Sequence, residues 1–225
     1  MTSSTRLSAL REQVRGLLDE SALRLSDLLT ARVERARVAR LRTRARIDAS
    51  AQILPESRIE NLRGDPSRMN IGAHTAVRGE LITLGHGGRI DIGAWCYVGA
   101  STRVWSASHV AIGDRVLIAH GCDIHDWNAH PLDAQARHRH YRDILEGGHP
   151  QELGDVPAVP VRIEDDVWIG FGSVVMKGVT IGRGSVVAAR SLVTKSVAPG
   201  WLVGGSPAVP IREIPISTPS PDEPP

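Results

Sequence analysis

The stretch IEDDVWIGFGSVVMKGVTIGRGSVVAARSLV, residues 163–193, repeats with a period of six residues. An aliphatic residue begins each hexad, in the order Ile163, Ile169, Val175, Ile181, Val187 and Val193. The position four residues later is small or β-branched, in the order Val167, Ser173, Val179, Ser185, Ser191 and Val197. A helix repeats every ~3.6 residues and a strand every ~2, so neither accounts for a period of six. The pattern predicts a parallel β-helix, in which each hexad forms a short strand and a corner, and three hexads close one coil.

The same period extends upstream. A second run, with a two-residue insertion before its fourth member, consists of Ile92, Val98, Val104, Ile112, Ile118 and Ile124. A weaker run begins the repeat region with Ile47, Ile53, Ile59, Ile71 and Val77. The positions four residues into the second run hold Cys96, Thr102, Ser108, Val116 and Cys122, so we expect both cysteines to be buried fillers rather than nucleophiles. Gly often follows the aliphatic residue, where we expect it to tolerate the backbone of the corner.

The hexads divide the chain into segments. Residues 5–45 are predicted to be helical, because apolar residues recur there at steps of three and four, namely Leu7, Leu10, Val14, Leu17, Leu18, Leu25, Leu28 and Leu29. We therefore expect a helical segment over 1–46, a β-helix over 47–214 and a flexible Pro-rich tail over 215–225. The repeat stops after Ile124 and resumes at Ile163. The excursion between them, 125–162, is rich in histidine, and a long excursion from a regular solenoid is usually functional.

Composition and charge limit the fold classes, cellular locations and partners that we expect for the chain. With 41% hydrophobic but only 4% aromatic residues, the core must be built from small aliphatic side chains, which argues against an ordinary helical bundle. We expect no transmembrane helix, no secretory signal and no disulfide framework, and hence a cytoplasmic location. Seven arginines lie between Arg32 and Arg46 against one acid, Glu34. This stretch, 32–46, is either a solvated helix face or a contact with an anionic membrane surface, and we expect no nucleic-acid partner.

Five motifs resemble, in order and spacing, those of the hexapeptide-repeat acyltransferases. They are the hexads, the loop motif DWNAHPLD at 126–133, DDVWIG at 165–170, VTK at 193–195, and GGSPA at 204–208 followed by IRE at 211–213. The resemblance covers about residues 47–214 and is closest to the sugar and polysaccharide O-acetyltransferases. It implies a left-handed β-helix and a homotrimer. It also implies acetyl-CoA as co-substrate, bound in a cleft between coils, with no tightly bound cofactor and no metal.

The resemblance also implies roles for individual residues. His130 matches the general base that takes the proton of the acceptor hydroxyl, a task suited to an imidazole because its pKa lies near neutrality. Counting back from the proline that precedes the resumed hexads gives Asp155 as the carboxylate that orients this base, with Glu152 and Asp126 as rivals. The residues that match the family's coenzyme A contacts are Trp168, Gly170, Phe171, Ala189, Thr194, Lys195 and Arg212. Thr194 and Lys195 match the pair near the phosphates, and Arg212 matches the arginine at the adenosine end.

These observations predict an O-acetyltransferase that moves an acetyl group from acetyl-CoA directly to a hydroxyl of a sugar or polysaccharide precursor. Where galactoside and maltose acetyltransferases have acceptor-binding Asn and Asp, this chain has Gly99 or Ser101, and Ser106. The acceptor therefore stays open. One alternative is a zinc enzyme resembling the gamma-class carbonic anhydrases, with His86, His120 and His125 as candidate ligands. The other is a non-catalytic β-helix scaffold.

Overall fold

The computed structural model describes the backbone of residues 3–216 and the side chains of residue 20 and of 22–216. It divides the chain into two compact units, Met1–Leu41 and Arg42–Pro225. Of the predicted tail, residues 217–225 lie outside the described part. So do the side chains of the first five members of the predicted helical stripe, from Leu7 to Leu18.

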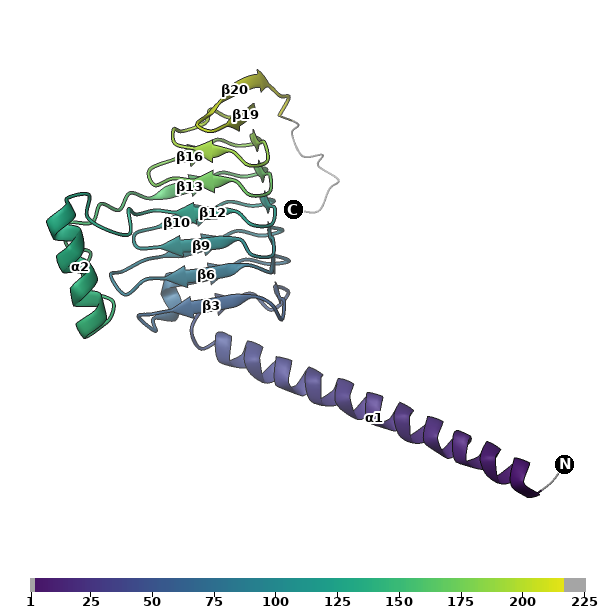
Figure 1. Cartoon of the computed structure of the whole chain (residues 1–225). Coiled ribbons are helices and arrows are strands. Elements are labelled where there is room, and N and C mark those ends of the chain that lie inside the picture. The colour runs from purple at the N-terminus through teal and green to yellow at the C-terminus, as the bar shows by residue number, and fades with distance from the viewer. Residues whose placement is uncertain (1–2, 217–225) are drawn as a thin grey trace. The chain divides into compact units, whose positions relative to one another are not determined.

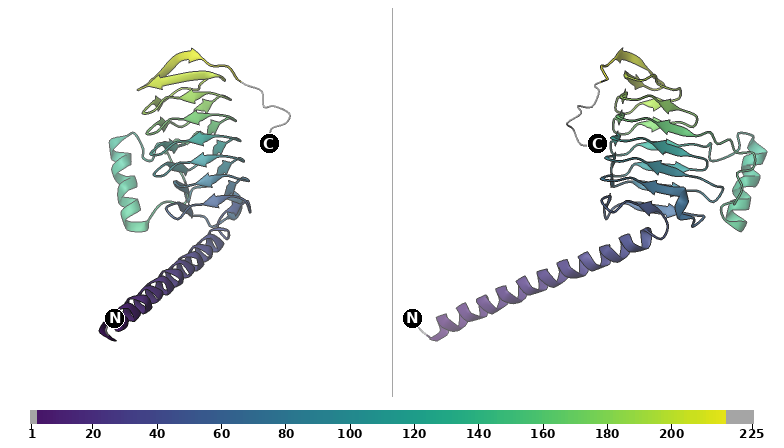
Figure 2. Two further views of the ribbon diagram at one scale, coloured as in Figure 1. Left: turned by 90° about the vertical axis from the view of Figure 1, so that its right-hand side faces the viewer. Right: turned by 180° about the vertical axis from the view of Figure 1, so that it is seen from behind.

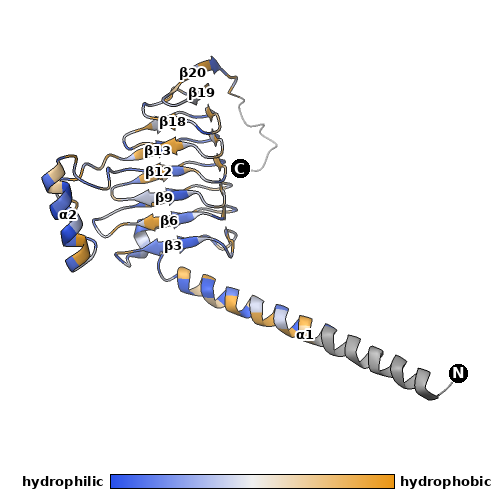
Figure 3. Cartoon of the chain, viewed as in Figure 1, coloured by the Kyte–Doolittle hydropathy of each residue, from blue (hydrophilic) through white to orange (hydrophobic). Residues whose placement is uncertain are grey.

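The first unit is one helix, α1 (Ser3–Leu41). It ends four residues before the predicted boundary, because Ala45 and Ile47 alternate inward with exposed Arg46 and so begin the period of a strand. Hydrophobic and hydrophilic residues are interspersed along its described part (Figure 3). Leu25, Leu28 and Leu29 are exposed there.

The second unit is a parallel β-helix with three sheets, and each coil runs from sheet A through B to C (Figure 1). Sheet A contains β1 (Arg46–Ile47), β4 (Met69–Ile71), β7 (Ile90–Ile92), β10 (Val110–Ile112), β13 (Val161–Ile163) and β16 (Thr180–Ile181). Sheet B contains β2 (Gln52–Ile53), β5 (Ala76–Val77), β8 (Tyr97–Val98), β11 (Leu117–Ile118), β14 (Trp168–Ile169), β17 (Val186–Val187) and the terminal hairpin β19 (Trp201–Gly205) and β20 (Ala208–Glu213). Sheet C contains β3 (Arg58–Asn61), β6 (Glu80–Thr83), β9 (Arg103–Ser106), β12 (Asp123–His125), β15 (Val174–Val175) and β18 (Leu192–Val193). A 3-10 turn, η1 (Pro66–Arg68), precedes β4.

The hexad prediction is confirmed by burial. Every aliphatic residue of the three runs is buried, and equivalent residues stack in register, as Ile112 does between Ile92 and Ile163. The period of six did not reveal a second inward position in sheet A, where the three-residue strands also bury Met69, Ile90, Val110 and Val161. The hexad pattern also predicted that Ser108 points inward, and this prediction is wrong. The two-residue insertion lengthens β9, so Ser106 is buried instead and Ser108 is half-buried.

The backbone at the corners shows that the role predicted for glycine, tolerance of the corner conformation, is wrong. The residue three positions after the aliphatic one has a positive φ in coil after coil, as in Trp95, Ser101, Arg115, Asp166 and Arg190. The glycines directly after the aliphatic residue do not have a positive φ. They are needed for close approach, because a Cβ on Gly170 would lie 2.5 Å from the backbone nitrogen of Ala189 in the next coil.

Both cysteines are buried, as predicted. The Sγ of Cys96 donates to the carbonyl of Gly113 at 3.0 Å, and that of Cys122 donates to Gly170 at 3.3 Å. Burial raises the pKa of Cys96 to about 11 and also raises that of Cys122. Neither thiol is therefore an available thiolate.

The three faces of the solenoid differ in their outward side chains. On sheet B the outward column is apolar, with Tyr97, Leu117 and Trp168 in register. On sheet A the corresponding column is polar and includes Asp91 and Arg162. Sheet C begins with alternating charges, Arg58, Glu80, Arg103 and Asp123, which pair across neighbouring strands.

Candidate active site

The excursion leaves the solenoid at the CA corner, the turn of each coil from sheet C to sheet A. It carries a second helix, α2 (Ala134–Gly147), which sequence reasoning did not anticipate. Asp133 caps its start by accepting from the amide of Ala136 at 2.8 Å, and Gly148 caps its end with a positive φ. Its half-buried residues, Ala136, His140 and Ile144, recur every four positions. They face the stack of strands, beside which the helix lies (Figures 1 and 2).

A buried carboxylate anchors the point of departure. Asp126 accepts from the hydroxyl of Ser106 at 2.6 Å and from the amides of Ala107 and Ser108 at 2.7 and 3.0 Å. Asp126 was one candidate to orient His130. Its oxygens instead join two successive coils, which fixes where the excursion begins.

His130 lies near another histidine rather than near a carboxylate. Its Nδ1 is 3.1 Å from Nδ1 of His140, and the two rings meet edge to face at 5.2 Å. Two imidazole nitrogens form a hydrogen bond only when one of them carries the proton. Asp155 and Glu152 are exposed, and within the described residues neither is hydrogen-bonded to His130. Asp155 as orienter stays a prediction; the four-residue stripe of α2 was the signal that could have pointed to His140.

His130 and His140 line a groove of about 420 Å³ between α2 and the outer side of sheet C. Its other lining residues are Arg58, Glu60, Leu62, Ile82, Leu84, His86, Trp105, Trp127, Ala129, Ile144, His149 and Pro150. Next to it, the rings of His125, Trp105 and Trp127 form a cluster, in which the His125 centroid is 5.4 Å from that of Trp105 and 5.0 Å from that of Trp127, and the two tryptophan centroids are 6.5 Å apart. Burial lowers the pKa of both His86 and His125. Burial therefore favours the neutral form of these two imidazoles.

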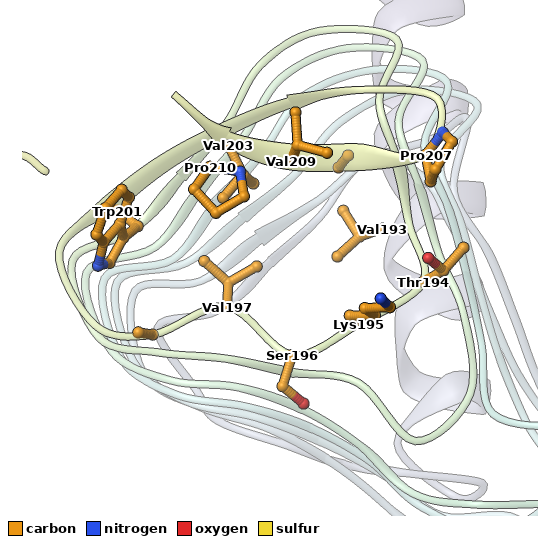
Figure 4. A pocket seen from close by; sticks show the side chains of 12 residues that line it. Val193, Thr194, Lys195, Ser196, Val197, Trp201, Val203, Pro207, Val209 and Pro210 are labelled. Carbon is orange, nitrogen blue, oxygen red and sulfur yellow. The ribbon is translucent and has the colours of Figure 1, made fainter. Parts of the chain in front are cut away.

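Thr194 and Lys195 lie on the same CA corner, two coils beyond the excursion, which is about 10 Å along the stack at ~4.8 Å per coil. They line a hollow of about 500 Å³ under the terminal hairpin. Figure 4 shows that valine and proline side chains supply most of the remaining wall. The pair is therefore at the rim of an apolar space, on the same side of the solenoid as His130.

The other predicted coenzyme A contacts lie elsewhere. Gly170 and Ala189 touch across successive coils at the BC corner, the turn from sheet B to sheet C, and Trp168 is exposed beside them in β14. Phe171, at the same corner, stacks on His120 at 5.2 Å. Arg212 is exposed in β20 of sheet B. About five residues of sheet C separate the BC and CA corners, or roughly 15 Å at ~3.3 Å per residue. One chain therefore does not bring the two sets of residues together.

The candidate zinc ligands are also separated. His120 packs against Phe171 at the BC corner, whereas His125 packs against Trp105 at the other end of sheet C. Among the residues whose positions are described, no cluster of three His, Cys, Asp or Glu is arranged to hold a metal ion.

Comparison with known proteins agrees with the repeat. Residues 160–195 match the family described as bacterial transferase hexapeptide (six repeats). Galactoside O-acetyltransferase of Escherichia coli is 32% identical over 133 residues, which are 59% of this chain and 58% of that protein. Chloramphenicol acetyltransferase of Agrobacterium fabrum is 48% identical over 60 residues, 27% of this chain and 29% of that one. The chain spans about half the length of the curated relatives that it matches.

Solved structures agree with the fold. An N-acyltransferase from Bacillus cereus, a mutant in complex with dTDP-4-amino-4,6-dideoxyglucose and coenzyme A, superposes with a TM-score of 0.62. The two are 17% identical, and the superposition covers 81% of this chain and 90% of that one. At this identity the likeness concerns the fold alone. Residues 160–195 thus match the bacterial transferase hexapeptide repeat, and the fold of the repeat region is a left-handed parallel β-helix.

Proposed function

We propose that the protein transfers an acetyl group from acetyl-CoA to a hydroxyl of a sugar or polysaccharide precursor. The observation that carries this proposal is His130, at the rim of a groove and on the same corner as Thr194 and Lys195. The sequence relatives of this chain include acetyltransferases whose names give acceptors as different as a galactoside and chloramphenicol. Acetyl transfer is what these relatives share, so the donor is better supported than the acceptor.

His130 is the proposed general base. As the acceptor oxygen attacks the thioester carbonyl, its proton passes to the imidazole, and the backbone amide of Phe171 is the proposed donor to the oxyanion. Collapse of the tetrahedral intermediate breaks the C–S bond, and His130 returns the proton to the departing thiolate. No acyl-enzyme is needed, because both cysteines are buried with raised pKa values.

We propose that the active unit is a homotrimer, because the residues assigned to one reaction lie on two corners of each chain. The apolar column on sheet B supports this. Leu117 and Trp168, neighbours in register, are 50% and 53% exposed, as expected of a surface that a second chain covers. A site that uses the BC corner of one copy and the CA corner of the next would then lie at the subunit interface. Sedimentation equilibrium should give three times the 24.3-kDa chain mass, and a monomer would contradict this proposal.

The function is tested by release of the coenzyme A thiol from acetyl-CoA with a panel of sugars, nucleotide sugars and oligosaccharides. We expect thiol release that depends on both acetyl-CoA and one class of sugar, together with an acetylated product in the mass spectrum. Hydration of carbon dioxide by protein that contains stoichiometric zinc would favour the carbonic-anhydrase alternative. Thiol release with no sugar, and a product that carries no acetyl group, would contradict acetyl transfer.

No helix among the described residues has the length and apolar character needed to cross a membrane. We propose that the protein is cytoplasmic and that residues 32–46 contact the anionic inner face of the membrane. Arg32 and Arg35 are exposed on α1, whereas Arg37 pairs with Glu34 at 2.6 Å. Attraction of about 1 kcal/mol per basic residue gives weak, salt-sensitive binding. Sedimentation with anionic vesicles at low but not high salt is the expected result, and no sedimentation at low salt contradicts it.

A further inference from the structure

The floor of the groove between α2 and sheet C is apolar and partly aromatic. Ile82 and Trp105 line it and lie in register on neighbouring strands, so their side chains project from the same outer side of the sheet, and His125 is the next residue in this register. Across from them, α2 contributes His140 and Ile144. With a volume of about 420 Å³, the groove is within the ~300–1,000 Å³ range of small-molecule sites.

Two polar atoms on its wall have no partner. Within the described part of the chain, Nδ1 of His86 and Nε1 of Trp105 are buried without a hydrogen bond, and both residues line the groove. Buried polar groups of folded proteins are almost always hydrogen-bonded. The indole nitrogen can only donate, so an occupant of the groove that brings an oxygen or nitrogen acceptor within its reach would satisfy it.

The charges of the wall favour an uncharged occupant. Of the described residues that line the groove, Arg58 is the only Arg or Lys, and its Nε pairs with Glu60 at 3.0 Å. It also lies 3.8 Å from Glu80. The wall therefore offers aromatic surface and the hydrogen-bonding groups of histidines, but no arginine or lysine without a carboxylate partner for a phosphate. A sugar ring matches this chemistry, because its C–H faces pack on aromatic rings while its hydroxyls both donate and accept.

We infer that this groove holds the acceptor as an uncharged pyranose ring, packed on Trp105 and Trp127 with one hydroxyl directed at His130. The inference rests on the proposed function for the identity of the base. It goes further in naming where the acceptor binds, which residues select it and which class of sugar it is. Nucleotide sugars would place their phosphates outside the groove or not bind.

The first experiment fills the groove. Ile144→Trp places a large side chain inside it, whereas Leu145→Trp adds the same side chain at the next, 66% exposed position of α2 as a matched control. Binding of methyl glucoside, galactoside and mannoside is followed by saturation-transfer NMR, without acetyl-CoA. We expect at least one methyl pyranoside to bind the parent and the Leu145→Trp protein, and binding to be lost in Ile144→Trp.

The second experiment removes one hydrogen-bond donor and keeps the ring. Trp105→Phe should raise the KM for the pyranoside about threefold to tenfold, the effect of one neutral hydrogen bond, and leave the KM for acetyl-CoA unchanged. An equal change in both KM values would show that Trp105 acts only on the fold. This variant also keeps the inference testable if Ile144→Trp does not fold.

The outcomes separate the inference from the function on which it rests. Groove-dependent pyranoside binding without acetyl transfer would leave the sugar site standing and remove the proposed function. Acetyl transfer to a pyranoside that Ile144→Trp leaves intact would keep the function and overturn the groove as its acceptor site. Binding of UDP-glucose but of no methyl pyranoside would overturn the assignment to an uncharged ring.

Discussion

The BC and CA corners are built from the same hexads but carry different chemistry. At the BC corner, His120, Phe171 and Arg190 follow one another in successive coils, and each ring is covered by the next: His120 by Phe171, and Phe171 by the guanidinium of Arg190. At the CA corner the repeat is interrupted, and His130 is exposed on the excursion at the rim of a groove. Coils only ~4.8 Å apart leave a corner side chain little freedom. A base that must meet two substrates therefore requires a departure from the repeat.

The largest effect on this comparison is expected from removing the proposed base, His130. His130→Ala should lower kcat by roughly 10²–10⁴-fold, the usual contribution of a general base, while the affinity for acetyl-CoA changes little. His138→Ala is the matched control, because His138 is an exposed histidine of the same excursion. Steady-state thiol release with the best sugar measures both. Near-parental turnover in His130→Ala would contradict the assignment of the base.

The second way is to separate the corners by dissociating the subunits. Leu117→Asp places a charge in the apolar column of sheet B, so we expect a monomer and at least a tenfold loss of turnover at nanomolar enzyme. Thr180→Asp adds the same charge to the polar face of sheet A, next to Arg162, and should remain a trimer. Analytical ultracentrifugation and the thiol assay are run on the same samples. A fully active monomer would show that one chain holds a complete site.

A third test concerns the binding of the donor at the CA corner. Lys195→Ala should raise the KM for acetyl-CoA about tenfold with a smaller change in kcat, because a phosphate contact is the same in the ground and transition states. The effect should shrink with acetyl-pantetheine, which lacks the nucleotide. Lys177, the chain's other lysine, lies one coil earlier on this corner and is the control. Equal losses with both donors would place Lys195 in another role.

The regular corner was predictable from sequence, and the irregular one was not. A period of six fixes which residue points inward, and so Ile118, Ile169 and Val187 were predicted to be buried and are. The same period cannot describe the second inward residue of sheet A, such as Ile90, because it belongs to the extra length of one strand in three. The period also suggested that Gly170 is needed for an unusual backbone conformation, whereas the structure shows that it is needed because the next coil leaves no room for a Cβ.

Within the excursion, the sequence indicated which residue type could act, but not which side chains contact one another. His130 was chosen from its motif, and Asp155 from a count along the chain. The contact between His130 and His140 depends on α2 folding back over sheet C, which brings together residues ten positions apart through a helix and its caps. Nothing in a six-residue repeat specifies that fold. That Asp155 orients His130 stays a prediction.

The smallest expected effect concerns His125, a half-buried histidine where the excursion begins. His125 packs against Trp105 and Trp127, and burial there lowers its pKa below the ordinary 6.5. The nearby Asp123 and Asp126 act in the opposite direction and Arg103 in the same one, but burial dominates. As the pH falls below 6.5, the unfolded chain therefore binds a proton that the folded chain resists, and stability decreases.

His125→Phe keeps the stacked ring and removes the titration. Its free energy of unfolding should fall less steeply between pH 6.5 and 5 than that of the parent, by at most about 1.4 kcal/mol per pH unit, since one proton is involved. At pH 8, His125 is neutral in both the folded and the unfolded parent. The variant should then be as stable as the parent or more stable, because it lacks the buried Nε2, which has no hydrogen bond. Urea unfolding at several pH values measures this, with the exposed His138→Phe as control. Identical pH slopes for parent and His125→Phe would mean that His125 protonates freely in the folded chain, and that its contact with the two tryptophans opens to water.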